Sequence, residues 1–279
     1  MTTTTTPDIE SAVQNRSGCP LHTMFAWAGE GTGSALSRWG VMAFGLVAYG
    51  AFFATILYAI GFVGNWIVPK GIDAGTASPL GVALGINTLL LSLFVVQHTI
   101  MARPAFKRWW TRFVPAPAER SIFVLTTCVC FGLLFWQWRP LPGLVWEIEA
   151  GWLRYAVAGV SLGGWGLVFL SSFLINHFDL FGLRQITLYF SGKKYTAVNF
   201  QITWLYRIVR HPLMVGFLVA FWAAPTMTVG RLFFAAMCTG YILMGTWFEE
   251  RDLVRELGEP YRQYQRSVRG LIPLPKRQG

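Results

Sequence analysis

Side chains able to do chemistry gather where long apolar runs end. The densest group is the decapeptide Asn-His-Phe-Asp-Leu-Phe-Gly-Leu-Arg-Gln, which starts at Asn176. His177 and Asp179 can take up protons, and Arg184 can orient a carboxylate or stabilise an anion. An ordinary helix cap at a membrane surface needs only one or two such groups. The decapeptide therefore predicts a catalytic site that includes these four polar residues, with Phe178 as a candidate substrate contact.

A second group runs from Tyr206 to Gly216 and reads Tyr-Arg-Ile-Val-Arg-His-Pro-Leu-Met-Val-Gly. Pro212 suits the first turn of a helix, because its missing N–H would have no partner there. The free N–H groups of that turn favour an anion, and Arg210 and His211 add charge and donors. The pattern predicts a binding site for a carboxylate or a phosphate, and Gly216 permits close approach of a ligand or another backbone.

A third group combines acidic residues with a compact aromatic segment. Glu249 and Glu250 directly follow an apolar run, and the segment Gly-Glu-Pro-Tyr-Arg-Gln-Tyr around Tyr261 comes soon after. The carboxylates can bind a ligand or form ion pairs with nearby arginines. His98 lies near the end of another apolar run and close to Arg103, so we keep it as a candidate substrate-binding residue beside the commoner role of a packed histidine.

The composition shows which elements must position these groups. Of 279 residues, 54% are hydrophobic and 13% are charged, whereas soluble domains carry about 25% charged residues. Spanning helices need about 20 mostly apolar residues, and four runs qualify: Trp39 to Val63, Leu80 to Met101, Ser121 to Trp138 and Trp152 to Ile175. We therefore predict an all-α, polytopic membrane bundle.

Two further apolar runs, Leu213 to Val229 and Leu232 to Phe248, are separated only by Gly230 and Arg231. Pro225 shortens the first of them. We expect a C-terminal helical hairpin that need not reach the far surface, which gives five or six membrane segments. With two crossings for the hairpin, the total is even.

Loop charge predicts the orientation. The loops 102–120 and 176–211 are strongly basic, whereas the loops 64–79 and 139–151 are neutral or acidic. Basic loops face the cytoplasm, so we expect both termini there, with the chain in the cell membrane. The net charge of +10 then indicates contact with lipid headgroups of the bilayer, and we expect no nucleic acid partner.

The chain divides into a tail and one folded domain. Residues 1–33 are mostly polar and Thr-rich and lack the features of a targeting signal, so we expect a mostly disordered cytoplasmic tail with a short amphipathic piece around 21–28. Residues 34–279 form the membrane domain. The spacing of the four cysteines is not that of metal ligands, and we expect no metal.

The second and third groups together resemble isoprenylcysteine carboxyl methyltransferases and their relatives, which are membrane enzymes using S-adenosylmethionine. The resemblance rests on Arg-His-Pro-Leu-x-x-Gly, an apolar hairpin, Glu-Glu and Gly-x-x-Tyr-x-x-Tyr. Upstream, Gln97-His98, Arg103-Pro104 and Glu119-Arg120-Ser121 resemble the NnrU-type branch. The decapeptide at Asn176 and Trp-Ala-Ala-Pro-Thr-Met-Thr-Val-Gly at Trp222 are similar to its methanethiol S-methyltransferase subgroup.

This resemblance implies methylation of methanethiol to dimethyl sulfide, with a cofactor-binding part over about 176–273. It implies that the cofactor contacts are Tyr206, Arg210, His211, Pro212, Met214, Gly216, Glu249, Glu250 and Tyr261. Met214 stands where the family motif often has Tyr, so a hydroxyl contact to the cofactor is missing there. For a thiol acceptor, His177 or Asp179 would be the base, and Arg184 would stabilise the thiolate or orient Asp179.

Three alternatives remain open at this point. The acceptor could be an isoprenylated cysteine or a phospholipid amine instead of a small-molecule thiol. Some NnrU-type relatives are haem-containing isomerases, in which His98 and His177 would be axial ligands. A transporter would explain the spans but not the polar clusters gathered on one side. The oligomeric state stays unknown.

Overall fold

The computed structural model describes residues 33–76, 78–196 and 204–272. The predicted tail and its amphipathic piece therefore lie, apart from Gly33, outside the described residues. The elements along the chain are α3 (Ala35–Gly64), α4 (Leu80–Ala102), α5 (Pro104–Trp110), η1 (Ala116–Ala118), α6 (Glu119–Gln137), β1 (Leu144–Glu147), α7 (Gly151–Ile175), α8 (His177–Leu180), α9 (Leu183–Phe190), η2 (Trp204–Arg207), α10 (Pro212–Trp222), β2 (Thr226–Thr228), α11 (Val229–Leu257) and α12 (Glu259–Ser267).

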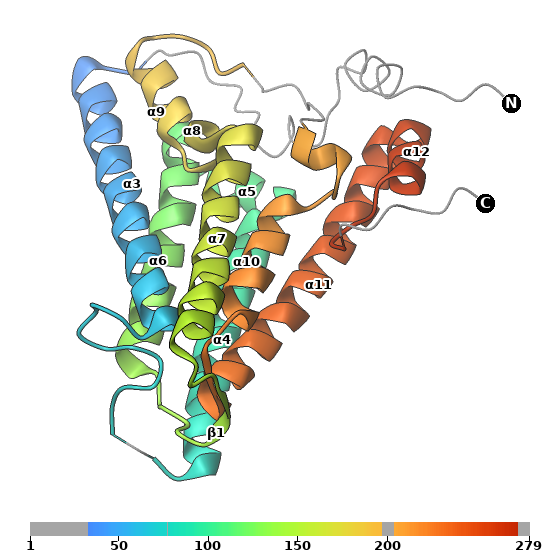
Figure 1. Cartoon of the computed structure of the whole chain (residues 1–279). Helices are drawn as coiled ribbons and strands as arrows, with labels where there is room; N and C mark the ends of the chain where they lie inside the picture. Colours follow the sequence, from blue (N-terminus) through green and yellow to red (C-terminus); the bar gives the residue numbers. More distant parts are fainter. Residues whose placement is uncertain (1–32, 77, 197–203, 273–279) are drawn as a thin grey trace, which may run out of the picture.

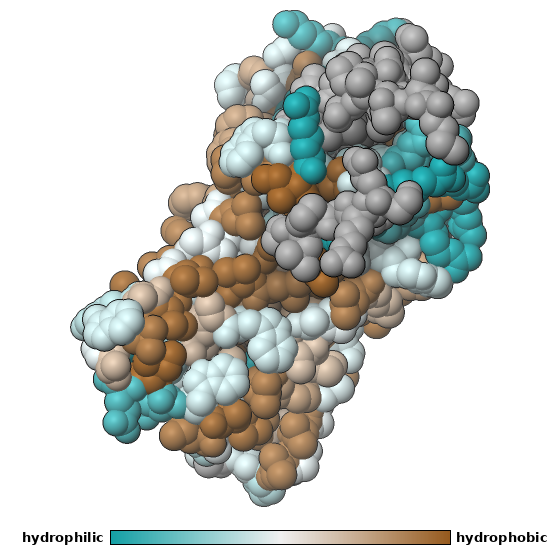
Figure 2. All heavy atoms as spheres, turned by 45° about the vertical axis from the view of Figure 1, so that its right-hand side comes forward, coloured by the Kyte–Doolittle hydropathy of each residue, from teal (hydrophilic) through white to brown (hydrophobic). Residues whose placement is uncertain are grey.

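Five helices are long and apolar enough to cross a membrane: α3, α4, α6, α7 and α11. Large apolar side chains stay exposed along their outer faces, as Leu46 and Leu57 do on α3 and Val160 and Leu170 on α7. Figure 2 shows a brown apolar band across the middle of one face, with teal polar residues gathered at its upper right. The predicted all-α membrane bundle is confirmed, with α10 as a shorter apolar helix.

The helices leave the three polar groups at one end of the bundle. Figure 1 shows α8, α9 and α12 at the upper end, where α3 begins, and β1 at the lower end. Below them, a core of aromatic and aliphatic side chains fills the space between the helices. Its largest fully buried member is Trp138, which donates from Nε1 to the carbonyl oxygen of Ile72 at 3.0 Å.

The predicted hairpin exists, but its turn lies earlier than the sequence suggested. Gly230 and Arg231 belong to α11, because β2 pairs with β1 and Thr228 caps α11 by accepting from the N–H of Arg231 at 3.2 Å. The turn reaches the loops at the lower end, since the N–H of Ile148 donates to the carbonyl oxygen of Pro225 at 2.9 Å. The helix α10 begins at Pro212, next to the predicted start, and is short because it ends at Trp222, before Pro225.

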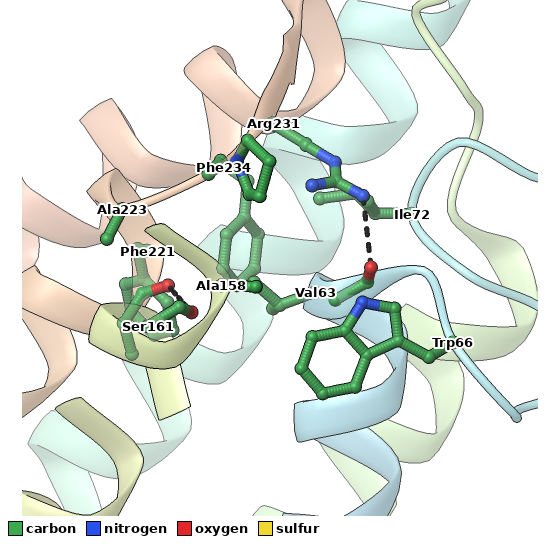
Figure 3. A pocket seen from close by; sticks show the side chains of 13 residues that line it. Val63, Trp66, Ile72, Ala158, Ser161, Phe221, Ala223, Arg231 and Phe234 are labelled. Atoms are coloured by element: carbon green, nitrogen blue, oxygen red, sulfur yellow. Dashed lines mark hydrogen bonds between the residues drawn. The ribbon is translucent and has the colours of Figure 1, made fainter. Parts of the chain in front are cut away.

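Arg231 fixes the lower end of α11. It donates to Asp73 at 2.8 Å, to the carbonyl oxygen of Thr226 at 3.1 Å and to that of Gly64 at 3.3 Å. Figure 3 shows Arg231 at the edge of a small, mainly apolar pocket, where Val63 and Phe234 are among the lining residues. Because every described partner of Arg231 is structural, this pocket lacks the groups of a reactive site.

Candidate functional site

Glu250 is the centre of the polar cluster at the start of α10. Its Oε1 accepts from the guanidinium of Arg210, at 2.6 Å from Nη2 and 2.8 Å from Nε, and lies 3.0 Å from Nε2 of His211. Its Oε2 accepts from Nε2 of Gln265 on α12 at 3.0 Å. The structure thus brings together Arg210 and His211, which directly precede α10, and Glu250, which lies on α11.

The segment after α12 folds back onto this cluster. The N–H of Arg210 donates to the carbonyl oxygen of Arg269 at 2.9 Å, and that of His211 donates to the carbonyl oxygen of Gly270 at 3.1 Å. The guanidinium of Arg210 also donates to the carbonyl oxygen of Val268. These bonds fix the segment 268–270 against the start of α10.

Tyrosines form the apolar wall of the cluster. Tyr261 and Tyr264 are buried on α12 with Leu257, and Tyr206 is half-buried against them. Tyr264 donates its hydroxyl to the carbonyl oxygen of Tyr206 at 2.6 Å. Burial raises the pKa of all three phenols, so near neutral pH they act as neutral hydrogen-bonding groups beside the charged residues.

The two adjacent glutamates differ sharply in their surroundings. The side chain of Glu250 is 20% exposed and its two oxygens are hydrogen-bonded, whereas that of Glu249 is 50% exposed. Glu249 lies 3.7 Å from Nδ1 of His211. Glu250 therefore holds the cluster together, and Glu249 is the more exposed of the two carboxylates.

The start of α10 offers backbone donors as predicted. Pro212 occupies the first turn, and no side chain caps this end of the helix. Met214 is half-buried in the same turn. Gly216 lies elsewhere: a Cβ there would be 2.8 Å from the carbonyl oxygen of Gly164 on α7. Its close approach therefore serves the packing of α10 on α7 rather than a ligand.

His177 is buried and has both ring nitrogens occupied. The Ser172 hydroxyl donates to the carbonyl oxygen of Phe169 at 2.7 Å, so it accepts from Nδ1 of His177 at 2.8 Å. Nε2 then accepts from the hydroxyl of Tyr49 at 2.9 Å. Burial also lowers the pKa of His177. This neutral, doubly bonded ring has no nitrogen left for a metal or for a substrate proton.

Asp179 is buried and is held by charged and polar partners. Its Oδ1 accepts from Nη1 of Arg184 at 3.1 Å and its Oδ2 from the hydroxyl of Tyr195 at 2.9 Å. Its backbone N–H donates to the side chain of Asn176 at 3.2 Å. Asn176 has a φ of 149°, a strained conformation that turns the chain out of α7. Asn176, Asp179 and Arg184 of the predicted group are therefore bonded together, whereas His177 bonds to Ser172 and Tyr49 instead.

Several residues of this site carried no clear sequence signal. Tyr195 follows two lysines in an unremarkable loop, and Arg120 belongs to the motif Glu119-Arg120-Ser121 but has no role predicted from the sequence. Arg120 donates from Nε to the carbonyl oxygen of Leu180 at 2.6 Å. Gln265 could have been predicted as a member of the site, because it lies one helical turn after Tyr261, on the same helix face.

The two residues predicted to contact a substrate differ in position. Phe178 is 51% exposed and meets the rings of Phe173 and His177 edge-on, so it lies on the outside of the site. His98 is enclosed by aromatic rings of α4, α6 and α11, and its Nδ1 is buried without a hydrogen-bond partner among the described residues. Nearby, Arg103 pairs with Asp252 at 3.3 Å.

The two main polar clusters remain separate. Figure 1 shows α8 and α9 apart from α12 at the same end of the bundle, with α7 between them in this view. Among the described residues, groups of three or more His, Cys, Asp or Glu that could hold a metal ion are not found. The site therefore consists of an ionic cluster on α10–α12 and a second cluster on α8–α9.

Proteins of known name resemble this chain over most of its length. Methanethiol S-methyltransferase 1 of Bradyrhizobium diazoefficiens is 51% identical over 252 residues, which cover 90% of this chain and 88% of that protein. Methanethiol S-methyltransferase of Mycobacterium tuberculosis is 50% identical over 242 residues, or 87% and 99% of the two chains. Nurim of Mus musculus is 28% identical over 179 residues, or 61% and 68%. No protein-family profile and no solved structure matches.

Proposed function

The chain belongs to the methanethiol S-methyltransferase family, and we propose that it transfers a methyl group from S-adenosylmethionine to methanethiol, giving dimethyl sulfide. The observation that supports this most directly is the length of the similarity, which covers 90% of the chain for the relative in Bradyrhizobium diazoefficiens. The members are enzymes by name, and the apolar helices make this chain a membrane protein. We further propose that it lies in the cell membrane with its termini and reactive end in the cytoplasm, following the basic loops.

The residues at the start of α10 suit S-adenosylmethionine. The uncapped first turn after Pro212 and the adjacent Arg210 favour its carboxylate. The exposed carboxylate of Glu249 suits its ammonium or its ribose hydroxyls. Arg269 on the fold-back segment has a buried Nε without a partner among the described residues, which is a further donor for the same ligand. Tyr206 and Tyr261 supply aromatic surface beside these groups.

When bound, the cofactor supplies an electrophilic methyl group on a sulfonium. The chain's own residues must orient the two reactants and exclude water. Glu250 contributes to the orientation of the cofactor indirectly, because it fixes Arg210 and His211 to α11 and α12. Asp179 and Arg184, bonded to each other, are proposed to position the acceptor end, where α7 gives way to α8 and α9. His177 is proposed to support this turn, since both its nitrogens are already bonded.

Headspace gas chromatography with mass detection tests this function. Purified protein in detergent would receive methanethiol and S-adenosylmethionine with a deuterated methyl group. We expect dimethyl sulfide heavier by three mass units in the wild type and a strong loss of product in Asp179→Ala. Arg154→Met is the matched control, because Arg154 pairs with Glu147 at the opposite end of the bundle at 3.2 Å. Cofactor binding without labelled dimethyl sulfide would reject methanethiol as acceptor, and absence of both would reject the methyltransferase.

A further inference from the structure

One aromatic ring in the upper part of the bundle contacts two polar side chains that the cofactor cluster does not use. The guanidinium carbon of Arg120 lies 4.7 Å from the centroid of the Phe123 ring. The imidazole of His98 lies 4.9 Å from the same ring, centroid to centroid. Phe123 is buried on α6, and His98 is close enough to Arg120 for the two to interact electrostatically.

His98 lies among aromatic rings. Its ring lies 5.3 Å from that of Phe94 and 6.3 Å from that of Tyr241 on α11. Its Nδ1 is buried and has no hydrogen-bond partner among the described residues. Its neighbour Gln97 instead donates to Thr126 at 3.0 Å. A buried nitrogen without a partner is destabilising, and a hydrogen bond to a ligand atom would remove that cost.

Arg120 brings positive charge to this place. Its guanidinium is close enough to Glu119 and Asp179 to interact electrostatically with both. On the neighbouring α5, burial and then the charge of Arg120 lower the pKa of Lys107 to about 8, although Glu119 lies 3.9 Å from its ammonium. The positive charge of Arg120 thus acts on neighbouring ionisable groups although carboxylates lie nearby. Such a field favours an anion over a neutral molecule.

The remaining charged groups of the neighbourhood belong to the second cluster. Asp179 on α8 pairs with Arg184 on α9, and the hydroxyl of Tyr195 donates to the same carboxylate. Arg120 also contacts α8 directly, through the carbonyl oxygen of Leu180. It therefore connects this cluster with the ring that touches His98.

We propose that His98 and Arg120 form the acceptor subsite, in which a small alkyl thiolate lies against Phe123. Its sulfur accepts a hydrogen bond from Nδ1–H of a neutral His98 and is stabilised by the charge of Arg120. This subsite rests on the proposed function, since a thiol methyltransferase needs the thiolate as its nucleophile. The S–H bond breaks with its electron pair left on sulfur, and the proton passes to water. Because the surrounding side chains are aromatic, the subsite suits an apolar alkyl group on the acceptor.

Acceptors of different acidity test the role of Arg120. Methanethiol is weakly acidic, whereas 2,2,2-trifluoroethanethiol ionises more readily. The thiolate of the fluorinated compound therefore depends less on stabilisation by a positive charge. We expect Arg120→Met to lower kcat/KM for methanethiol about 10- to 100-fold near neutral pH, as one to two pKa units of lost stabilisation imply. The loss for the fluorinated thiol should be several-fold smaller. Arg120→Lys should retain most of the activity, and Arg154→Met should behave as the wild type.

A second measurement does not depend on turnover. The carbon-13 chemical shift of labelled methanethiol, bound in the presence of S-adenosylhomocysteine, reports whether the thiol is ionised. We expect the bound thiol to ionise at lower pH than the free thiol, and this difference to shrink by about one unit in Arg120→Met. His98→Ala should weaken thiol binding about tenfold, while His98→Gln, which keeps a donor, should restore part of it.

The outcomes separate the subsite from the proposed function. Equal losses for both thiols in Arg120→Met, or an unchanged ionisation of the bound thiol, would overturn the subsite while the wild type still makes dimethyl sulfide. A wild type that binds the cofactor but makes no methylated thiol would overturn the proposed function and the subsite together. Unchanged cofactor binding by calorimetry in each variant shows that the variant is folded.

Discussion

The unequal surroundings of Glu249 and Glu250 predict that the same substitution at these adjacent positions will have different effects. Replacement of Glu250 should lower the stability of the protein, and replacement of Glu249 should lower its affinity for the cofactor. Glu250→Gln removes the charge that faces Arg210 and His211, whose side chains are 10% and 8% exposed. It also turns an amide group toward the amide of Gln265, which now donates to Glu250 at 3.0 Å. Glu249→Gln changes a half-exposed carboxylate and leaves this ionic cluster intact.

The magnitudes follow from burial. Removing one partner of a buried ion pair costs about 3–5 kcal/mol, and the partial exposure of Glu250 places the loss near the lower limit, about 3 kcal/mol. That corresponds to a fall in the unfolding midpoint of roughly 6–12 °C. For Glu249→Gln we expect a midpoint within about 2 °C of the wild type, because surface substitutions usually cost under about 0.5 kcal/mol. Its affinity for S-adenosylmethionine should fall about 10-fold or more, by the loss of a charge-assisted hydrogen bond.

Thermal unfolding in detergent and titration calorimetry with S-adenosylmethionine measure the two effects separately. Glu249→Asp serves as a control that keeps the charge. Equal midpoints for Glu250→Gln and Glu249→Gln would refute the assignment of Glu250 as the structural member. Full cofactor affinity in Glu249→Gln would refute Glu249 as a ligand contact.

Three further predictions concern packing, charge and the second cluster. Gly216→Ala should cost about 1–3 kcal/mol and lower the unfolding midpoint, because its Cβ would meet the backbone of α7; Gly159→Ala, with open space at its Cβ, should not. The folded pKa of Lys107, about 8 against 10.5, is depressed, so the folded chain binds fewer protons and wild-type stability rises with pH between these values. Lys107→Met should flatten that rise in pH-dependent unfolding, and an unchanged slope would contradict it. Tyr195→Phe should destabilise the α8–α9 turn by about 1–2 kcal/mol, seen as faster amide exchange around Asp179, and unchanged exchange would show that its hydroxyl bond is dispensable.

The sequence determined the membrane bundle and showed that the polar groups lie at the ends of its helices. A spanning helix is recognised from the length of one apolar run, which is a local property, and the first four predicted spans match α3, α4, α6 and α7 within a few residues. Ionisable residues are costly inside such helices, so the polar groups had to lie at their ends. The hairpin turn was placed too late, because the pairing of β2 with β1 joins segments that are distant in the chain.

Tertiary structure alone decided what each polar residue does. Glu249 and Glu250 are neighbours in sequence but point in directions about 100° apart on a helix, so only the packing of α10 and α12 on α11 selects Glu250 as the partner of Arg210, 40 residues away. Likewise, the hydroxyl that occupies Nε2 of His177 comes from Tyr49, 128 residues earlier. The sequence shows which groups are present at one end of the bundle. Their hydrogen-bond partners depend on distances between helices, which periodicity and spacing along one chain do not contain.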